Sequence, residues 1–558
     1  MNKFVLTLLL ITVPWSIKSQ NFNGFALYNS QGSNTTYLID ENQNIAHTWN
    51  MNTECNYTVL LKENGNLVRG TKNNGNILGG AAEGGRVQEI APDGTVVWDY
   101  VYSNSDHLSH HDITLIGDNV LLTAWEVKTQ SEVYAAGFTG NVGNNGKWPT
   151  HFVEIKDDGN GGANIIWEWH IWDHLCQDVD PNKPNYVSNI SDHPELIDIN
   201  MITGGGGGPG GSSGDWFHVN GVDYNEELDQ IAFSSRFASE IYIIDHSTTT
   251  LEAASHSGGN SGMGGDILYR WGNPSNYGFS APQIIPNAVH DVRWITNDGR
   301  PNSGFLQIFN NSGGGNNQST IDGIKAPLDT VTGFTYFRNQ GQPYDPISYS
   351  TRYQCVYSAP GQSASDRMSN GNIFVNASAG QGGSGVMYEV DSNGSIVWGP
   401  YNSQSQKGFR YECDYPGIIA LEPYMNNINS TSCFNFESWN CDNNYNCTDP
   451  GDGSGQYSNL NDCIQECVNV SVLENNKLND FYPNPTTGVI FFDMIADDFS
   501  SIKIINYLGQ KILESEYIIR YKGEKIKEIN LSSLNDGVYM IYLIDISGNY
   551  ICKKIIKG

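Results

Sequence analysis

The sequence predicts an all-β protein: a six-bladed β-propeller, then a small cysteine-rich segment, then a C-terminal immunoglobulin-like β-sandwich. Aromatic residues make up 11% of the chain beside 61 glycines, which favours short strands joined by tight turns. A pattern of strands and glycine turns repeats between residues 20 and 425. The 558 residues exceed one ordinary core, so we expect segments 1–19, 20–425, 426–470 and 475–558 to be separate parts.

The charge distribution supports the last boundary and excludes some partners. The chain carries 30 Lys+Arg and 60 Asp+Glu, a net charge of −30. Residues 471–558 contain 10 basic and 11 acidic residues, so almost all of the acidity lies before them. Such a chain lacks the basic face that nucleic acids or anionic membranes require.

The N-terminus is typical of a secretory signal peptide over residues 1–19. Lys3 precedes an apolar run, Phe4 to Trp15, that is too short to span a bilayer. No later stretch reaches the ~18 apolar residues of a membrane span, so we expect a secreted or surface-exposed protein with no membrane span.

Five cysteines define the segment 426–470: Cys433, Cys441, Cys447, Cys463 and Cys467. In an exported chain they predict disulfides, because so short a stretch with few aliphatic residues cannot build a core. A zinc site is disfavoured, since the usual ligand spacings and a nearby histidine are missing. The Asp449–Gly455 loop suits calcium or, more simply, a run of turns, because no EF-hand glutamate follows. The fifth cysteine has Cys413 as one candidate partner.

The propeller prediction rests on a unit that reads Asn-Gly-Asn, strand, Glu, strand, Asp/Asn-Gly turn, and Val-Trp. Clear copies end at Trp98 and Trp398, and weaker ones at Trp49, Trp169 and Trp271. Units starting near Phe25, Cys55, His107, Trp216, His290 and Tyr353 give six blades. A β-helix is the alternative, but its repeats are shorter and lack Asp-Gly hairpins. Glycine stretches 204–214 and 258–265 are expected to be surface loops.

The histidines are the candidate site residues. All twelve lie at or before His290, and His110, His111, His218 and His290 occupy the starts of probable inner strands. Inner strands line the channel, so these side chains are expected to converge. Strand alternation puts Trp216, His218 and Asn220 on the same face of one strand. In a second strand it puts His290, Val292 and Trp294 on the same face.

A cluster of histidines with arginines suits an anionic group such as sulfate. We expect no metal, although the same histidines offer metal ligands, and purely structural hydrogen bonding is the plain alternative. Arg236 and Arg270 are candidate anion contacts, with stacking or inter-blade pairing as the alternative.

The tail carries motifs of a known family. Tyr482-Pro483-Asn484-Pro485-Thr486-Thr487-Gly488 opens a run of strands, LSSLNDG starts at Leu531, and the chain ends in Lys553-Lys554-Ile555-Ile556-Lys557. This resembles the C-terminal sorting domain of the Bacteroidetes type IX secretion system. The resemblance implies export across the outer membrane and contact with the type IX machinery.

The middle of the chain resembles the aryl-sulfate sulfotransferases. The matching runs are 215–224, 231–236, Tyr269 to Pro274, His290-Asp291 and Phe309-Asn310-Asn311. That family is a six-bladed propeller that moves sulfuryl groups between phenols through a sulfated histidine, without 3′-phosphoadenylyl sulfate or another cofactor. The resemblance implies that His218 and His290 hold the sulfuryl group, that His110 or His111 is a base or alternative nucleophile, and that Asn220 and Asn310 contact substrate.

Two departures leave a second hypothesis open. No Arg follows Asn311. The family carries its nucleophilic histidine in the run that corresponds to Gln362–Arg367, and here that run contains no histidine. Arg367 offers charge there but no nucleophile. The first hypothesis is therefore an arylsulfotransferase-like enzyme acting on aryl sulfates and phenols. The second is a non-catalytic propeller that binds an anionic or glycan ligand at the cell surface.

Overall fold

A computed structural model describes most of the chain. It covers residues 24–426 apart from 31, 204–213 and 281; residues 431–467 apart from 432, 435–437, 443–445, 450–454 and 458; and residues 481–558 apart from 494–498, 507–509, 516–519, 522–525 and 546–549. The predicted signal peptide, nearly all of the 204–214 glycine stretch and most of the acidic 449–455 loop lie outside these residues. One compact unit ends at Ser438, and a second holds most of the chain from Trp439 on.

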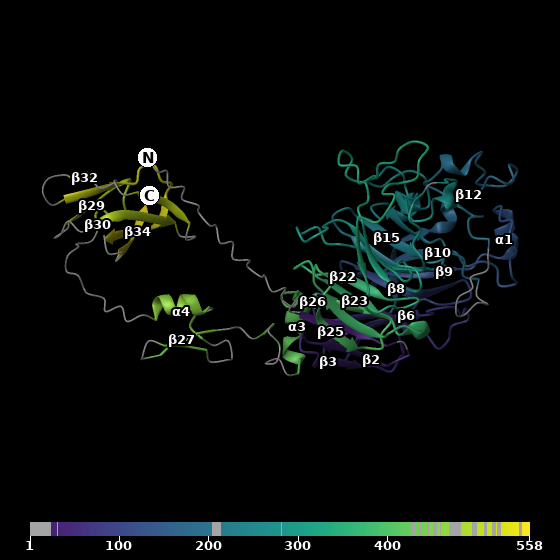
Figure 1. Ribbon diagram of the computed structural model, residues 1–558, viewed down its shortest axis with the longest axis horizontal. Coiled ribbons are helices and arrows are strands. Elements are labelled where there is room, and N and C mark those ends of the chain that lie inside the picture. Colours follow the sequence, from purple (N-terminus) through teal and green to yellow (C-terminus); the bar gives the residue numbers. More distant parts are fainter. Residues whose placement is uncertain are drawn as a thin grey trace, which may run out of the picture. The chain divides into compact units, whose positions relative to one another are not determined.

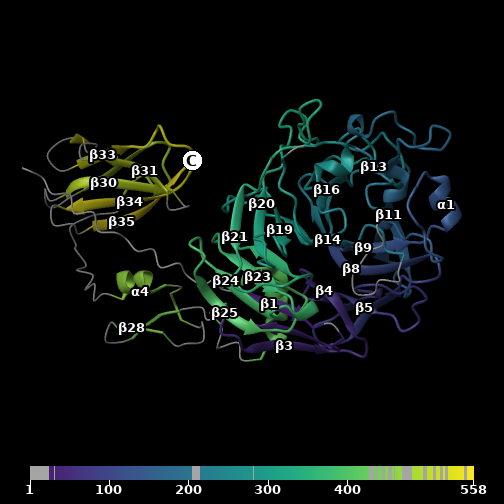
Figure 2. The ribbon, with the colours of Figure 1, turned by 45° about the vertical axis from the view of Figure 1, so that its right-hand side comes forward.

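The described residues of the first unit contain six four-stranded antiparallel sheets, seen in Figures 1 and 2. In sheet order they are β26 (Lys407–Glu412), β1 (Gly24–Asn29), β2 (Thr35–Ile39), β3 (Ile45–Asn50); β4 (Cys55–Leu61), β5 (Leu67–Lys72), β6 (Gly85–Ile90), β7 (Val96–Val101); β8 (His107–Ile116), β9 (Asn119–Glu126), β10 (Thr150–Asp157), β11 (Ala163–His170); β14 (Val219–Asn225), β15 (Gln230–Ser235), β16 (Glu240–Asp245), β17 (Tyr269–Trp271); β18 (Val289–Trp294), β19 (Leu306–Asn310), β20 (Thr320–Ile324), β21 (Thr351–Gln354); and β22 (Ala364–Arg367), β23 (Ile373–Ala377), β24 (Val386–Val390), β25 (Ile396–Asn402).

The first strands of these sheets form a closed ring. Contacts run from β4 to β8, β14, β18, β22 and β26, and back to β4. Strand β26 comes from the end of the unit yet pairs with β1, so it closes the ring by completing the first sheet. This is the arrangement of a β-propeller, as the sequence predicts.

A buried ionic network ties the inner strands together. Lys407 Nζ on β26 lies 2.8 Å from Asp112 Oδ2 on β8 and 2.8 Å from Asp291 Oδ1 on β18. Asp112 also accepts hydrogen bonds from Thr58 on β4 and from the Val222 amide on β14. All three charges are almost fully buried, so Lys407 compensates both carboxylates, and Arg293 adds a second cation at 3.2 Å from Asp291.

The tryptophans at the ends of the predicted repeats join neighbouring sheets. Each of the five lies on the fourth strand of its sheet and donates its indole N–H to a carbonyl of the next sheet or its adjoining loop. The pairs are Trp49 to Ala91, Trp98 to Gly162, Trp169 to Gly265, Trp271 to Pro346 and Trp398 to Glu41. The tryptophan at the end of the repeat thus marks the contact between one sheet and the next.

Short strands, helices and 3₁₀ turns lie between or after the strands of these sheets. They are β12 (Leu175–Cys176) and β13 (Ile197–Asp198), the helices α1 (Gln130–Ala135), α2 (Thr250–Ala253) and α3 (Pro416–Leu421), and the 3₁₀ turns η1 (Ile171–His174), η2 (Ile190–Asp192), η3 (Pro274–Tyr277), η4 (Gly380–Gly382) and η5 (Glu422–Tyr424). Within the described part of the chain, no helix has the length and apolarity of a membrane span.

Two details of the repeat prediction are wrong. Tyr353 lies on β21, the outer strand of one sheet, and the next sheet begins at Ala364. Strict alternation also fails at the starts of β14 and β18, where the pairing register shifts and His218 and Asp291 have positive φ. Trp216 packs into the apolar core whereas His218, two residues later, lines a pocket, so the two side chains do not share a face.

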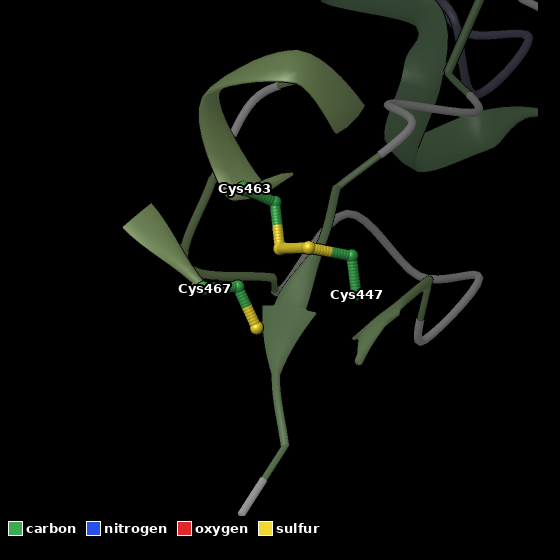
Figure 3. A group of neighbouring side chains, drawn as sticks. All are labelled: Cys447, Cys463 and Cys467. Carbon is green, nitrogen blue, oxygen red and sulfur yellow. A yellow bond between two sulfur atoms is a disulfide. The ribbon is translucent and has the colours of Figure 1, made fainter. Parts of the chain in front are cut away.

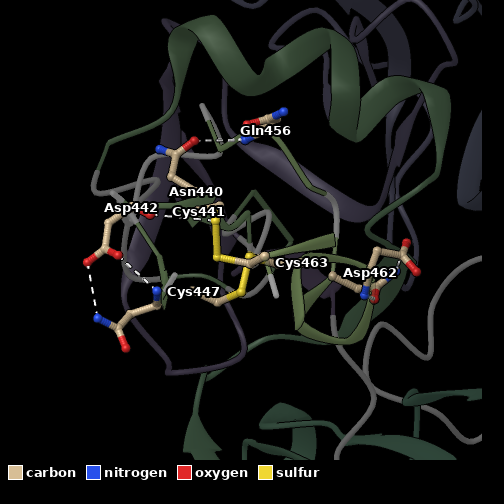
Figure 4. Close-up of a disulfide and its surroundings, with 10 residues drawn as sticks. Asn440, Cys441, Asp442, Cys447, Gln456, Asp462 and Cys463 are labelled. Carbon is tan, nitrogen blue, oxygen red and sulfur yellow. Dashed lines mark hydrogen bonds between the residues drawn. A yellow bond between two sulfur atoms is a disulfide. The ribbon is translucent and has the colours of Figure 1, made fainter. Parts of the chain in front are cut away.

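Disulfides hold the cysteine-rich segment, as predicted. Cys413 pairs with Cys433, Cys441 with Cys467, and Cys447 with Cys463. Strands β27 (Asn440–Cys441) and β28 (Cys447–Thr448) and helix α4 (Leu460–Glu466) carry the last two bonds. Figure 3 shows the Cys447–Cys463 bond beside Cys467, and Figure 4 shows Asp442 and Asn440 closing the surrounding turns through hydrogen bonds.

The C-terminal part is a β-sandwich of two sheets. One contains β31 (Lys511–Ser515), β30 (Phe499–Asn506), β34 (Gly537–Asp545) and β35 (Tyr550–Lys557); the other contains β29 (Val489–Asp493), β33 (Ile526–Asn530) and β32 (Arg520–Tyr521). Both sheets contribute to one apolar core that includes Ile490, Ile504 and Ile541. The Tyr482–Gly488 motif lies against the last strand, because Asn484 bonds the backbone of both Lys554 and Ile556.

Candidate histidine site

A small pocket lies where several inner strands of the propeller begin. Its lining residues come from five of the six sheets and their loops: Tyr57, Ala81, His111, His218, Arg236, Phe237, His290, Gln362 and Gln381. Its free space is about 20 Å³. The backbone is strained here, since His111, His218 and Gln362 all have positive φ, which residues with a Cβ rarely adopt.

His218 is paired with a buried carboxylate. Its Nδ1 lies 2.5 Å from Asp215 Oδ2, and the other carboxylate oxygen accepts hydrogen bonds from the Trp125 indole and the His218 amide. The imidazole also stacks on Phe237 at 4.6 Å between ring centroids. Because a carboxylate holds the proton on Nδ1, the Nε2 atom of His218 carries the lone pair.

His290 is held by two acceptors. Its Nδ1 lies 2.8 Å from Asn311 Oδ1 and 2.9 Å from the Ala288 carbonyl oxygen. A ring nitrogen that faces only these two oxygens carries the hydrogen, which leaves the lone pair on Nε2. Asn311 is fixed in turn, because its amide donates to the carbonyls of Ala359 and Gln362.

His110 and His111 form a pair. Their Nδ1 atoms lie 2.7 Å apart and share one proton. His110 stacks on Trp125 at 3.9 Å, outside the pocket lining. His111 lines the pocket, with its ring 4.6 Å from that of His218 and 5.7 Å from that of Tyr57.

Burial keeps most of these rings neutral. It lowers the pKa of His110 to about 3 and the pKa of His111 well below 6.5, and the neighbouring histidines add to the second effect. Burial and then the charge of Arg236 lower the pKa of His290. Burial also lowers the pKa of Arg236, and among the described residues no carboxylate lies within ion-pair distance of its guanidinium.

This arrangement suits a small anion. Within the described part of the chain, no hydrogen bond occupies the Nε2 atoms of His111, His218 and His290, which line the pocket beside Arg236. An uncompensated cation in a poorly hydrated pocket attracts an oxyanion strongly. The groups of metal-ligating side chains found among the described residues do not include these three histidines.

Three residues predicted to contact substrate bond to other parts of the protein instead. Arg270 is fully buried, bonds Glu240 through two nitrogens at 2.7 and 3.1 Å, and lies over Tyr277. The Asn220 amide donates to the Val289 carbonyl and joins β14 to β18. The Asn310 amide donates to Asp322. These side chains serve inter-strand and inter-blade contacts, the alternative considered for arginine.

Sequence reasoning missed several members of the pocket. Tyr57, Phe237 and Gln362 line it, and Asp215 and Asn311 orient its histidines. The Asp215-x-x-His218 spacing is a signal that was available, since residues three apart across a bulged strand start can meet. Tyr57 and Gln362 carried no such signal, because they lie 305 residues apart and meet only through ring closure.

Comparison with solved structures finds distant likenesses. A protein of unknown function from Bacteroides caccae is 10% identical, over 70% of this chain and 98% of that one, with a TM-score of 0.38. The Swd1 β-propeller domain of Myceliophteria thermophila is 10% identical, over 67% and 84%, with a TM-score of 0.30. Values this low carry no argument about function. No curated protein matches the sequence.

Family models match both parts of the chain. Residues 480–558 match the secretion system C-terminal sorting domain, which indicates export by type IX secretion to the cell surface or beyond and implies contact with that machinery. Residues 13–335 match the arylsulfotransferase (ASST) model, and this range includes His111, His218, Arg236 and His290. Because the match spans more than half of the 558 residues, the chain belongs to the arylsulfotransferase family.

Proposed function

We propose that this protein transfers a sulfuryl group from an aryl sulfate to a phenol at the histidine pocket, with His218 as the covalent carrier and without a nucleotide donor. The observation that carries the proposal is the Asp215–His218 pair, which presents an Nε2 lone pair to the pocket beside Arg236. The same Asp–His pairing activates or orients histidines in many enzymes of group transfer.

In the first step, the Nε2 lone pair of His218 attacks the sulfur. The bond between sulfur and the aryl oxygen breaks, and its electron pair leaves with the phenolate, which solvent protonates. Arg236 neutralises the sulfuryl oxygens, and Asp215 stabilises the positive charge that develops on the imidazole.

In the second step, the oxygen of the acceptor phenol attacks the sulfur. The N–S bond breaks and its electron pair returns to Nε2 of His218. His290, which is neutral because burial lowers its pKa, accepts the proton of the acceptor phenol on its Nε2 and then releases it to solvent.

One observation favours the second candidate function, the binding of an anionic or glycan ligand without transfer. Gln362 lines the pocket where the family resemblance implies a nucleophilic histidine, and an amide cannot carry a sulfuryl group in that role. In this case Arg236 and the histidines hold the anion and no bond breaks.

The two functions are separated by one assay. Purified protein is incubated with p-nitrophenyl sulfate and phenol, and p-nitrophenol release is followed for the native chain and for His218→Ala. His246→Ala is the matched control, because His246 also pairs with an aspartate, Asp229, at 2.6 Å but does not line the pocket. Transfer predicts release that only His218→Ala abolishes. No release from the native chain, with sulfate ester binding intact, establishes binding alone.

A further inference from the structure

A second group of histidines lies outside the pocket, on the edge of the propeller. His174 ends η1, after the third sheet, while His256 and Asp266 belong to the loop between α2 and β17 of the fourth sheet. One ligand atom from each residue lies within 4.8 Å of the other two. The proposed transfer does not use these residues.

Each ring nitrogen of His174 lies within hydrogen-bond distance of an oxygen. Its Nε2 lies 2.8 Å from the Ala253 carbonyl oxygen, an acceptor only, so Nε2 carries the hydrogen. Its Nδ1 lies 2.8 Å from Asp266 Oδ1. This nitrogen and this oxygen are the ligand atoms that the two residues would offer to one ion.

His256 contacts the same carboxylate as His174. Its Nδ1 lies 2.7 Å from the same oxygen, Asp266 Oδ1. Asp266 and His174 are buried, whereas 62% of the His256 side chain is exposed. One carboxylate oxygen thus meets two ring nitrogens, and the exposed imidazole gives an ion access from solvent.

The surroundings hold these ligands in place. His174 stacks on Trp169 with an interplanar angle of 6°, and the Trp169 indole donates to the carbonyl oxygen of Gly265 in the same loop. A Cβ at Gly265 would lie 2.0 Å from the Ala253 carbonyl oxygen and 2.6 Å from His174 Nε2. Glycine at this position therefore lets the loop pack closely against His174 and places Asp266 beside the imidazole. A backbone carbonyl behind a histidine ligand is the usual outer-shell partner in metal sites.

We propose that His174, His256 and Asp266 bind one divalent transition-metal ion, with Zn²⁺ as the best match. Two imidazole nitrogens and one carboxylate oxygen suit Zn²⁺ or Co²⁺, whereas Ca²⁺ and Mg²⁺ prefer oxygen ligands alone. The ion would fasten the loop before β17 to the end of the third sheet, and so stabilise two neighbouring blades. The alternative is a buried imidazolium–carboxylate pair with no ion.

The test uses the full chain after removal of metal with a chelator. Zn²⁺ binding is measured by calorimetry, and Co²⁺ by its visible absorption, for the native chain, His256→Ala and Asp266→Asn. His256→Ala is well suited because its side chain is largely exposed, so folding should survive. His193→Ala is the matched control, since His193 is another half-exposed histidine that faces a carboxylate, Glu195, at 3.0 Å.

We expect one Zn²⁺ per chain, a tenfold or greater loss of affinity in His256→Ala and in Asp266→Asn, and no change in His193→Ala. Saturating Zn²⁺ should also raise the melting temperature of the native chain but not of His256→Ala. No uptake by the native chain, or equal uptake by His256→Ala, would overturn the proposal. So would uptake that His218→Ala removes and His256→Ala leaves intact, because the ion would then lie in the channel pocket.

Discussion

Replacing Asp215 by Asn tests the proposed role of His218 with little change in shape. The carboxylate oxygen that accepts from the Trp125 indole and the His218 amide has an equivalent in the Asn carbonyl. The Asn amide then takes the place of Oδ2 and donates to Nδ1 of His218. That hydrogen bond moves the ring proton to Nε2 and removes the lone pair that the first step needs.

The expected loss follows from the geometry of the pair. Asp215 and the positive charge that develops on His218 are separated by about 4 Å between charge centres, which corresponds to about 4 kcal/mol at an effective dielectric constant of about 20. Losing this stabilisation slows transfer by about 10³-fold. The wrong tautomer adds to the loss. We therefore expect kcat for p-nitrophenol release to fall by about 10³-fold or more in Asp215→Asn, with the melting temperature nearly unchanged.

Asp229→Asn is the matched control, because Asp229 makes the same kind of bond to Nδ1 of His246 outside the pocket. It should leave kcat unchanged. Equal rates in Asp215→Asn and the native protein, or an equal loss in Asp229→Asn, would refute the assignment of His218 as the carrier.

Three further predictions concern stability, pH and export. Lys407→Met leaves Asp112 buried without its cation and Asp291 with Arg293 alone, so the free energy of unfolding in urea should fall by about 3–5 kcal/mol; an unchanged value contradicts the network. Burial lowers the pKa of His246, but hydrogen bonds to Asp229 and Glu154 outweigh it and raise the pKa to about 9. Its stabilisation is therefore complete below pH ~6.5 and is lost as the pH rises through about 9, a dependence that His246→Gln should remove in denaturation curves. Deletion of residues 480–558 should keep the protein inside the outer membrane, whereas surface or medium fractions that still contain it would contradict a sorting role.

Much of the architecture was accessible from local patterns. The tryptophan endings predicted where five of the repeats close, because the indole at that position donates a hydrogen bond to the next sheet or its loop. The disulfide segment and the tail were accessible for the same reason: short-range spacing of cysteines and motifs carries the information.

The details of the pocket were not accessible in this way. Bulges at the starts of the inner strands change which side chains face the channel, and their positive φ values at His111 and His218 have no sequence signature such as glycine. Arg236 and Arg270 look equivalent in sequence, yet only Arg270 meets a buried glutamate, Glu240, from its own sheet. The group formed by His174, His256 and Asp266 requires His174 to meet a loop about 80 residues later, which only the packing of two sheets could reveal.

The central claim is that His218 carries the sulfuryl group, and trapping that adduct tests it most directly. The protein is mixed with p-nitrophenyl sulfate without an acceptor, quenched at alkaline pH, digested and analysed by mass spectrometry. We predict a burst of one p-nitrophenol per chain and one added SO₃ on the peptide that contains His218, discharged when phenol is supplied. Neither burst nor adduct, or an adduct on another residue, would contradict the claim.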